Sequence, residues 1–151
     1  MIEIHCATDA DTRAAARRLA ALCRPGDVIV LNGRLGAGKT AFAGGLADGL
    51  GVDEPVTSPT FVLMRTYRSG FLPFFHVDAY RLGSIGEFED LAAIESAEDG
   101  VVVIEWGGAV SAALPKDRLE IELIRNPDES RTVRIHPSGS WVIRQLSEIE
   151  A

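Results

Sequence analysis

Two continuous runs of apolar residues stand out along the chain. Residues 28–31 read Val-Ile-Val-Leu and residues 101–104 read Val-Val-Val-Ile, and turn-forming residues flank both runs. Strands that are covered by helices on both faces show such runs, whereas half-exposed strands alternate between apolar and polar residues. The two runs therefore predict buried strands in the interior of a parallel sheet.

Helical and alternating patterns surround these runs. Thr8 suits the N-cap of a helix on which Ala15, Leu19 and Leu22 share one face. Further elements are predicted as strands over residues 1–6, 61–68 and 74–80, helices over 39–50 and 87–93, a hairpin over 118–125 and 131–136, and a closing helix that carries Val142, Leu146 and Ile149 on one face. This order predicts an α/β fold with a mixed, mostly parallel sheet flanked by helices and extended by antiparallel strands.

Length and composition restrict the class of protein. A chain of 151 residues suits one domain over residues 1–151. The net charge of −7 argues against a protein that binds nucleic acid by itself, because such binding draws on a basic surface. The first six residues do not resemble a secretory signal, and no apolar run approaches the roughly 18 residues of a membrane span. We therefore expect a cytoplasmic protein with no membrane association.

A glycine-rich segment follows the first apolar run and carries the strongest chemical signal. It reads Gly33-Arg34-Leu35-Gly36-Ala37-Gly38-Lys39-Thr40 and matches the phosphate-binding loop G-x-x-x-x-G-K-[ST]. Glycines let the backbone curl so that N–H groups point at phosphate oxygens, and the following helix adds the positive end of its dipole. Lys39 is expected to reach the β- and γ-phosphates, and the hydroxyl of Thr40 is expected to bind Mg²⁺. The pattern predicts a P-loop NTPase fold that binds nucleotide phosphates with Mg²⁺.

Two acidic residues are candidates for the rest of the site. Glu105 ends the second apolar run, and Asp78 ends the predicted strand that begins at residue 74. Ligands of open α/β sheets bind outside the carboxyl ends of the strands, and Mg²⁺ usually takes one or two protein carboxylates. We expect Glu105 to hold Mg²⁺, directly or through water. Asp78 either shares the metal or orients the attacking water.

Three other features of the sequence give weaker evidence about the site. Ser58-Pro59-Thr60-Phe61 lies where P-loop proteins often keep a segment that senses the γ-phosphate, but a plain proline turn has the same appearance. His76 is better explained as a hydrogen-bonded strand residue than as a metal ligand, because no further ligand cluster accompanies it. Trp106 either stacks on a ligand or packs in the protein, and the pattern does not distinguish the two.

Four features in this order resemble the bacterial TsaE family, also called YjeE. They are the loop 33–40, Ser58-Pro59-Thr60-Phe61, the motif His76-x-Asp78-x-Tyr80-Arg81-Leu82, and Ile104-Glu105-Trp106. The resemblance spans nearly the whole chain. It implies a Mg²⁺-dependent ATPase, weak alone, that works with the proteins TsaD and TsaB to make threonylcarbamoyladenosine in tRNA. Its ATP turnover would reset the TsaB–TsaD complex, and tRNA would be met only through that complex.

The resemblance also implies roles for individual residues. Lys39, Asp78, Glu105 and Thr60 would be catalytic, with Thr60 in the switch segment and Asp78 near the γ-phosphate. Thr40 and Glu105 would bind Mg²⁺. The nucleotide would be held by a larger set, which comprises Gly33, Gly36, Ala37, Gly38, Lys39, Thr40, Ala41 and Asp78, with Thr8 and Arg131 as weaker transfers.

Two other functions fit a phosphate-binding loop. A small-molecule kinase usually needs an arginine-rich lid, whereas the stretch after Arg81 is acidic. A nucleotide-dependent adaptor that does not hydrolyse ATP is the second alternative, and the presence of both Asp78 and Glu105 argues for turnover instead. A GTPase is disfavoured because the chain contains no N-K-x-D motif to bind guanine.

Overall fold

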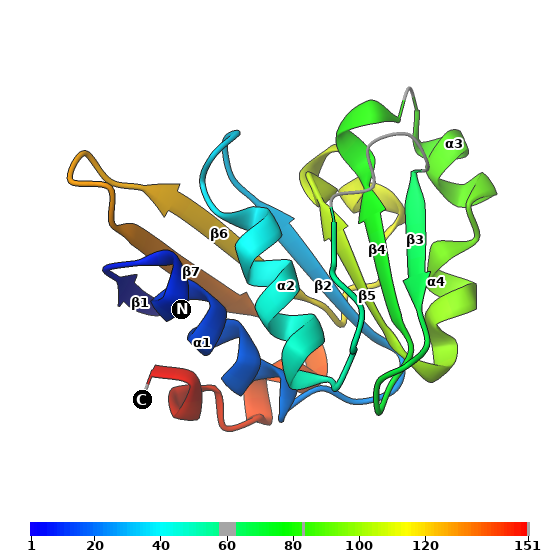
Figure 1. Ribbon diagram of the computed structural model, residues 1–151. Coiled ribbons are helices and arrows are strands. Elements are labelled where there is room, and N and C mark those ends of the chain that lie inside the picture. The colour runs from blue at the N-terminus through cyan, green and yellow to red at the C-terminus, as the bar shows by residue number, and fades with distance from the viewer. Residues whose placement is uncertain (58–62, 83, 151) are drawn as a thin grey trace.

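A single seven-stranded sheet forms the centre of the molecule. In this computed structural model, which describes residues 1–57, 63–82 and 84–150, the strands lie in the order β1-β7-β6-β2-β5-β4-β3 (Figure 1). Their bounds are Ile2–Cys6 (β1), Asp27–Asn32 (β2), Met64–Tyr67 (β3), Phe74–Asp78 (β4), Val101–Glu105 (β5), Leu119–Arg125 (β6) and Arg131–Pro137 (β7). The two apolar runs, β2 and β5, are neighbours inside the sheet, as predicted.

The sheet is mixed. Strands β6, β2, β5 and β4 pair in parallel, while β7 is antiparallel to β6, β1 is antiparallel to β7, and β3 is antiparallel to β4. The four parallel strands therefore end at the same edge of the sheet. This arrangement confirms the predicted α/β class, with its parallel centre and its antiparallel additions at both sides.

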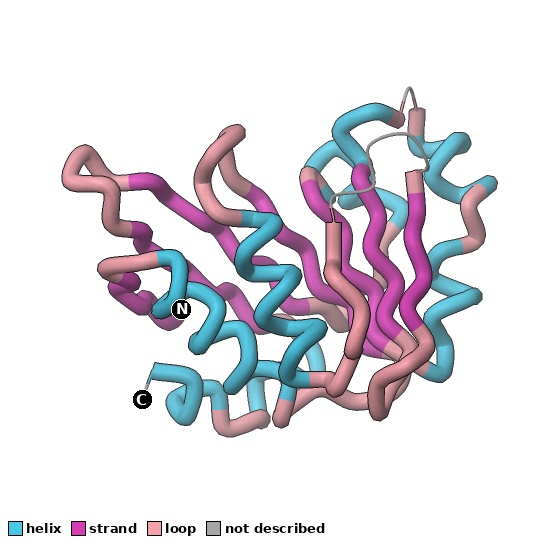
Figure 2. The backbone as a smooth tube through the Cα atoms, viewed as in Figure 1, coloured by secondary structure: helices cyan, strands magenta, loops and turns pink. Residues whose placement is uncertain are grey.

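Helices cover the two faces of the sheet unequally. Helices α1 (Asp9–Ala20) and α2 (Lys39–Gly49) lie side by side on one face (Figures 1 and 2). Helices α3 (Ile85–Asp90) and α4 (Ala93–Ser96) and a 3₁₀ segment (Gly107–Ala113) belong to the layer on the other face of β2, β5 and β4. Because both faces of these strands are covered, the central residues of β2 and β5, at positions 28–31 and 101–104, are all apolar.

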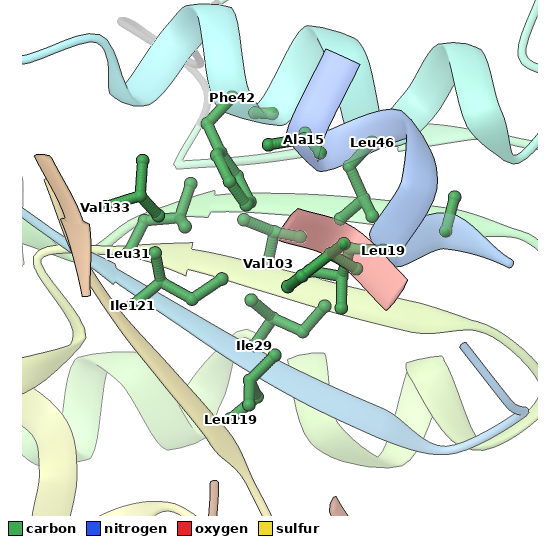
Figure 3. Close-up of a cluster of buried hydrophobic side chains, with 14 of the residues drawn as sticks. Ala15, Leu19, Ile29, Leu31, Phe42, Leu46, Val103, Leu119, Ile121 and Val133 are labelled. Atoms are coloured by element: carbon green, nitrogen blue, oxygen red, sulfur yellow. The ribbon is translucent and has the colours of Figure 1, made fainter. Parts of the chain in front are cut away.

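The larger core lies between the sheet and the pair α1 and α2. Phe42 and Leu46 of α2 and Leu19 of α1 point toward the strands, where they meet side chains such as Ile29 and Ile121 (Figure 3). These side chains are almost completely buried. Their burial anchors α2 on the sheet and so determines where the first turn of α2, which begins at Lys39, is placed.

A glycine permits the close approach of α1 and α2. A Cβ atom added at Gly45 would lie 2.4 Å from the backbone oxygen of Arg13, closer than two such atoms can approach. Helix α1 itself begins with a capping box, in which the Thr8 side chain accepts from the N–H of Asp11 and the Asp11 side chain accepts from the N–H of Thr8. The predicted N-cap is confirmed, and its hydroxyl is engaged by the helix.

Three predicted elements need correction. The predicted strand 74–80 stops at Asp78, because the Asp78 side chain accepts from the N–H of Tyr80 and begins a 3₁₀ turn. The predicted helix 87–93 is interrupted at Ala92, which has a positive φ of 50° and separates α3 from α4. Of the predicted strand 61–68, residues 61 and 62 lie outside the described residues and the described part begins at Met64.

The prediction of a closing helix in the C-terminal segment is also wrong. The C-terminal segment forms two short 3₁₀ helices, Gly139–Ile143 and Leu146–Glu150, and Val142 is 63% exposed rather than buried. A bidentate ion pair from Arg144 to the buried Asp27 separates the two turns, with distances of 2.6 and 2.8 Å. This contact between distant segments interrupts the predicted helix. Among the described helices, none combines the length and apolar character needed to cross a bilayer.

Candidate nucleotide-binding site

The loop between β2 and α2 stands at the edge where the parallel strands end (Figure 1). Gly38 is the N-cap of α2 and has a φ of 102°, a left-handed conformation that favours glycine. No side chain caps this helix. The first N–H groups of α2 are therefore directed toward the loop without a side-chain acceptor, which is the arrangement that binds anions at helix N-termini.

Lys39, the first residue of α2, lies folded back over the loop. Its Nζ donates to the backbone oxygen of Gly33 at 2.6 Å and to that of Arg34 at 3.0 Å, and it lies 4.2 Å from the centre of the Trp106 ring. Burial lowers the pKa of Lys39, and the negative charges of Glu105 and Asp78 oppose this effect. The ammonium thus lies against loop carbonyls and an aromatic face, and two carboxylates act on it through their charge.

The two carboxylates predicted for the site lie at the ends of adjacent strands. Asp78 of β4 is paired in register with Glu105 of β5, and Glu105 is paired in register with Leu31 of β2. Asp78 is 8% exposed and Glu105 is 4% exposed. The carboxylate of Glu105 contacts His76, whose Nε2 lies 2.5 Å from Oε2 of Glu105. The prediction of a hydrogen-bonded strand histidine is confirmed, although its partner was not foreseen.

Arg131 connects the distant strand β7 to the loop. Its Nε donates to the backbone oxygen of Ala37 at 3.1 Å, and its Nη2 donates to that of Gly36 at 3.2 Å. In a trans peptide the C=O and the N–H point in opposite directions. By holding two carbonyls, Arg131 therefore restrains the peptide planes whose N–H groups belong to Ala37 and Gly38.

These groups surround a cleft of about 720 Å³. Its lining contains most of the residues predicted for the nucleotide, namely Gly36, Gly38, Lys39, Thr40, Ala41, Asp78 and Arg131, together with Glu105, which was predicted for the metal. Gly33 and Ala37 line an adjoining cleft, which shares Leu35 and Trp106 with the first. Thr8 is at the start of α1, next to the cleft-lining Asp9, and Thr60 lies outside the described residues.

Three lining residues were not predicted from the sequence. Asp9, Leu35 and Tyr80 complete the wall of the cleft. Leu35 and Tyr80 lie inside the quoted motifs, but Leu35 carries no polar group and no role was predicted for the phenol of Tyr80. Trp106, which the sequence left open, has a φ of 62° and packs its ring against Tyr80 with 5.0 Å between the ring centres. Trp106 therefore packs within the site wall, between Lys39 and Tyr80.

The donor set fits Mg²⁺ held together with phosphate. Within residues 1–57, 63–82 and 84–150, no three His, Cys, Asp or Glu side chains are grouped so as to hold a metal by themselves. Mg²⁺ does not need such a cage, because it binds through one or two protein oxygens together with phosphate oxygens and water. Thr40 and Glu105 both line the cleft and supply a hydroxyl and a carboxylate, so the residues present fit this ion.

Comparison with known proteins finds a family that matches most of the chain. The family model for "Threonylcarbamoyl adenosine biosynthesis protein TsaE" matches residues 6–133. The chain belongs to the TsaE family. The matched range runs from the end of β1 to the middle of β7, so it contains the loop, both carboxylates and Arg131.

Individual TsaE relatives match over most of their length. The tRNA threonylcarbamoyladenosine biosynthesis protein TsaE of Streptomyces coelicolor is 45% identical over 143 residues, which cover 89% of this chain and 97% of that protein. The protein of the same name from Bacillus subtilis is 41% identical over 131 residues, covering 86% and 82%. The crystal structure of YdiB from Bacillus subtilis superposes with a TM-score of 0.78 at 33% identity, covering 97% of this chain and 91% of YdiB.

Proposed function

We propose that this protein is a Mg²⁺-dependent ATPase that takes part in the biosynthesis of threonylcarbamoyladenosine in tRNA. One observation carries the proposal. Lys39, Asp78 and Glu105 line the same cleft at the uncapped N-terminus of α2, although they come from three separate elements. Membership of the TsaE family, whose members are described as biosynthesis proteins for this nucleoside, supports the biological context.

The residues of the cleft have separate roles in phosphoryl transfer. The amides at the start of α2 bind phosphate oxygens, and Lys39 exchanges its carbonyl partners for the β- and γ-phosphates. Thr40 and Glu105 hold Mg²⁺, which neutralises charge on the phosphates when bound. Asp78 lies beside Glu105 at the strand ends and acts near the γ-phosphate, where it orients water. Catalysis here is positioning and electrostatic stabilisation of the developing charge.

The partners in this proposal are the proteins TsaB and TsaD. ATP turnover resets their complex between catalytic cycles, in the cytoplasm, and tRNA is met only through the complex. A net charge of −7 supports a subunit that binds proteins beside tRNA rather than the nucleic acid itself.

The test compares the two lysines of the chain. Lys39→Ala should lower Mg²⁺-dependent ATP hydrolysis by about 100-fold or more, because the loop amides alone do not neutralise the developing γ-phosphate charge. Lys116→Ala, at an exposed lysine outside the cleft, should leave hydrolysis unchanged. Phosphate release is measured with the protein alone and with TsaB and TsaD added. Normal binding and hydrolysis of ATP by the Lys39 variant would contradict the proposal.

The partner assignment has a separate test. The chain should co-purify with a TsaB–TsaD complex when ATP is present. If the chain hydrolyses ATP but associates with TsaB–TsaD in no nucleotide state, ATP hydrolysis would stand and the proposed role in threonylcarbamoyladenosine biosynthesis would fall. A small-molecule kinase would then be the better explanation of the biological role.

A further inference from the structure

His76 is a buried polar residue that the proposed phosphoryl transfer does not use. It lies in β4 with none of its surface exposed, and its Nε2 lies 2.5 Å from Oε2 of Glu105, which is 4% exposed. Burying two polar side chains costs free energy unless they bond to each other. The fold keeps such a pair at the end of the two strands that carry the candidate catalytic carboxylates.

The hydrogen bonding of the His76 ring is one-sided. Its second nitrogen, Nδ1, is buried and has no hydrogen-bond partner among the described residues. The ring of Phe74 lies nearby, with 6.0 Å between the ring centres. A ring that bonds through Nε2 alone is suited to donate its one proton there, because a carboxylate only accepts. Within the described part of the chain, the polar contact of His76 is therefore directed to Glu105.

We propose that His76 is a positioning residue, which donates from Nε2 to Oε2 of Glu105 and holds this carboxylate in the orientation that binds Mg²⁺ with ATP. The inference rests on the proposed function, in which Glu105 is a Mg²⁺ partner. With Oε2 engaged by His76, the other carboxylate oxygen is left for the ion. Outer partners of this kind fix the orientation of a ligand, and their loss typically lowers metal affinity or activity by about 10- to 100-fold.

The hydrogen bond between His76 and Glu105 also keeps the negative charge of Glu105 apart from the positive charge of Lys39. Glu105 and Lys39 line the same cleft, and the glutamate charge acts on the lysine. A glutamate side chain rotates about three bonds, and without a partner it is free to turn toward the ammonium. Such an ion pair would engage both the Lys39 ammonium, which is needed for phosphate, and the Glu105 carboxylate, which is needed for Mg²⁺. His76 holds Glu105 away from this pairing and leaves both groups to the nucleotide.

The hydrogen bond itself has a spectroscopic test. The chain has three histidines, and His5 and His136 are exposed strand residues that serve as internal references. In a long-range ¹H–¹⁵N spectrum of histidine-labelled protein, Nε2 of His76 should carry a proton with a downfield, slowly exchanging signal. Glu105→Ala should shift or remove that signal. An unprotonated Nε2, or a signal that Glu105→Ala leaves unchanged, would overturn the proposal.

The role toward Mg²⁺ has a binding test that needs no turnover. ADP affinity is measured by calorimetry as a function of Mg²⁺ concentration. His76→Leu should require about 10- to 100-fold more Mg²⁺ for the same strengthening of ADP binding, with binding in EDTA unchanged. His76→Gln, whose amide nitrogen reaches about as far as Nε2, should restore most of the response. His136→Gln, at an exposed position of β7, is the matched control.

The outcomes separate this inference from the proposed function. If Mg²⁺ does not strengthen nucleotide binding in the wild type, both fail. If Mg²⁺ strengthens binding equally in the wild type and in His76→Leu, the proposed function stands and the role of His76 is overturned. If His76→Leu does not fold, His76→Asn replaces it, since its amide is too short to reach Glu105. Rescue by Gln but not by Asn would support a role through Nε2.

Discussion

The ammonium of Lys39 lies 4.2 Å from the centre of the Trp106 ring, while it donates to the backbone oxygens of Gly33 and Arg34. Phosphate binding should draw Lys39 away from this ring and change the emission of Trp106. The other tryptophan, Trp141, is fully buried outside the cleft. Titration with ADP should therefore change the fluorescence of the wild type and of Trp141→Phe. An emission change that persists in Trp106→Phe would show that another tryptophan responds.

Glu105 should matter more for Mg²⁺-dependent steps than for nucleotide binding. Glu105→Ala is expected to lower ATP turnover by about 100-fold while ADP binding in EDTA is retained, because the carboxylate serves the metal rather than the phosphates. Glu120→Ala, at a half-buried position of β6 outside the cleft, is the control. Steady-state hydrolysis and calorimetry measure the two quantities. Equal losses in both would argue against the metal role.

Arg131 should organise the loop through its planar guanidinium. Arg131→Lys keeps the charge, but an ammonium does not reproduce two donors at fixed spacing to the carbonyls of Gly36 and Ala37. We expect ADP affinity to fall by about 10-fold, equivalent to about 1.4 kcal/mol. Arg134→Lys tests whether any arginine of β7 has this effect, since Arg134 forms ion pairs with Glu3 and Glu122 instead. Equal affinities for the two variants would refute the loop contact as the cause.

The contact of α1 with α2 should be sensitive to one added methyl group. Gly45→Ala places a Cβ where the backbone of Arg13 lies, so we expect a loss of about 1–3 kcal/mol in the free energy of unfolding. Gly86→Ala is a matched change in α3, where the nearest atom to the added Cβ is the Ser84 hydroxyl at 3.6 Å. Its effect should stay within about 0.5 kcal/mol. Urea unfolding measures both, and equal stabilities would contradict the close approach.

The thiol of Cys23 should be unreactive in the folded protein. Burial raises the pKa of Cys23 to about 12, and the charge of Asp27 acts in the same direction. Because the folded pKa lies above the unfolded one of about 8.5, this group stabilises the fold fully below that pH and less as the pH rises toward 12. Alkylation by iodoacetamide at pH 8.5 should be slow until urea is added. Rapid labelling of Cys23 without denaturant would contradict the raised pKa.

The sequence predicted the parts of the site that depend on local chemistry. The loop 33–40 is a continuous motif, and Asp78 and Glu105 could be placed because each directly follows an apolar strand. Parallel strands end at one edge of a sheet, so two carboxylates at strand ends had to meet near the loop. The sheet class followed in the same way from the continuous apolar runs of β2 and β5.

The rest depends on contacts between distant segments. The partner of His76 is 29 residues away in β5, and the carbonyls held by Arg131 are more than 90 residues away. No local pattern encodes such pairs. The closing helix was mispredicted for a related reason, because the pairing of Arg144 with Asp27 overrides the periodicity of Leu146 and Ile149.

The strand order has a consequence for folding while the chain is being synthesised. Strand β5 inserts between β2 and β4, both of which precede it in the chain, and β1 has its place beside β7, the last strand. Lys39 and Asp78 therefore emerge from the ribosome long before Glu105 arrives to complete the site between them. Strand β1, which leads into α1, gains its partner strand only when β7 has been made. A truncated chain that ends before β5 would carry the complete glycine-rich motif but would lack Glu105, one of the two residues proposed to hold Mg²⁺.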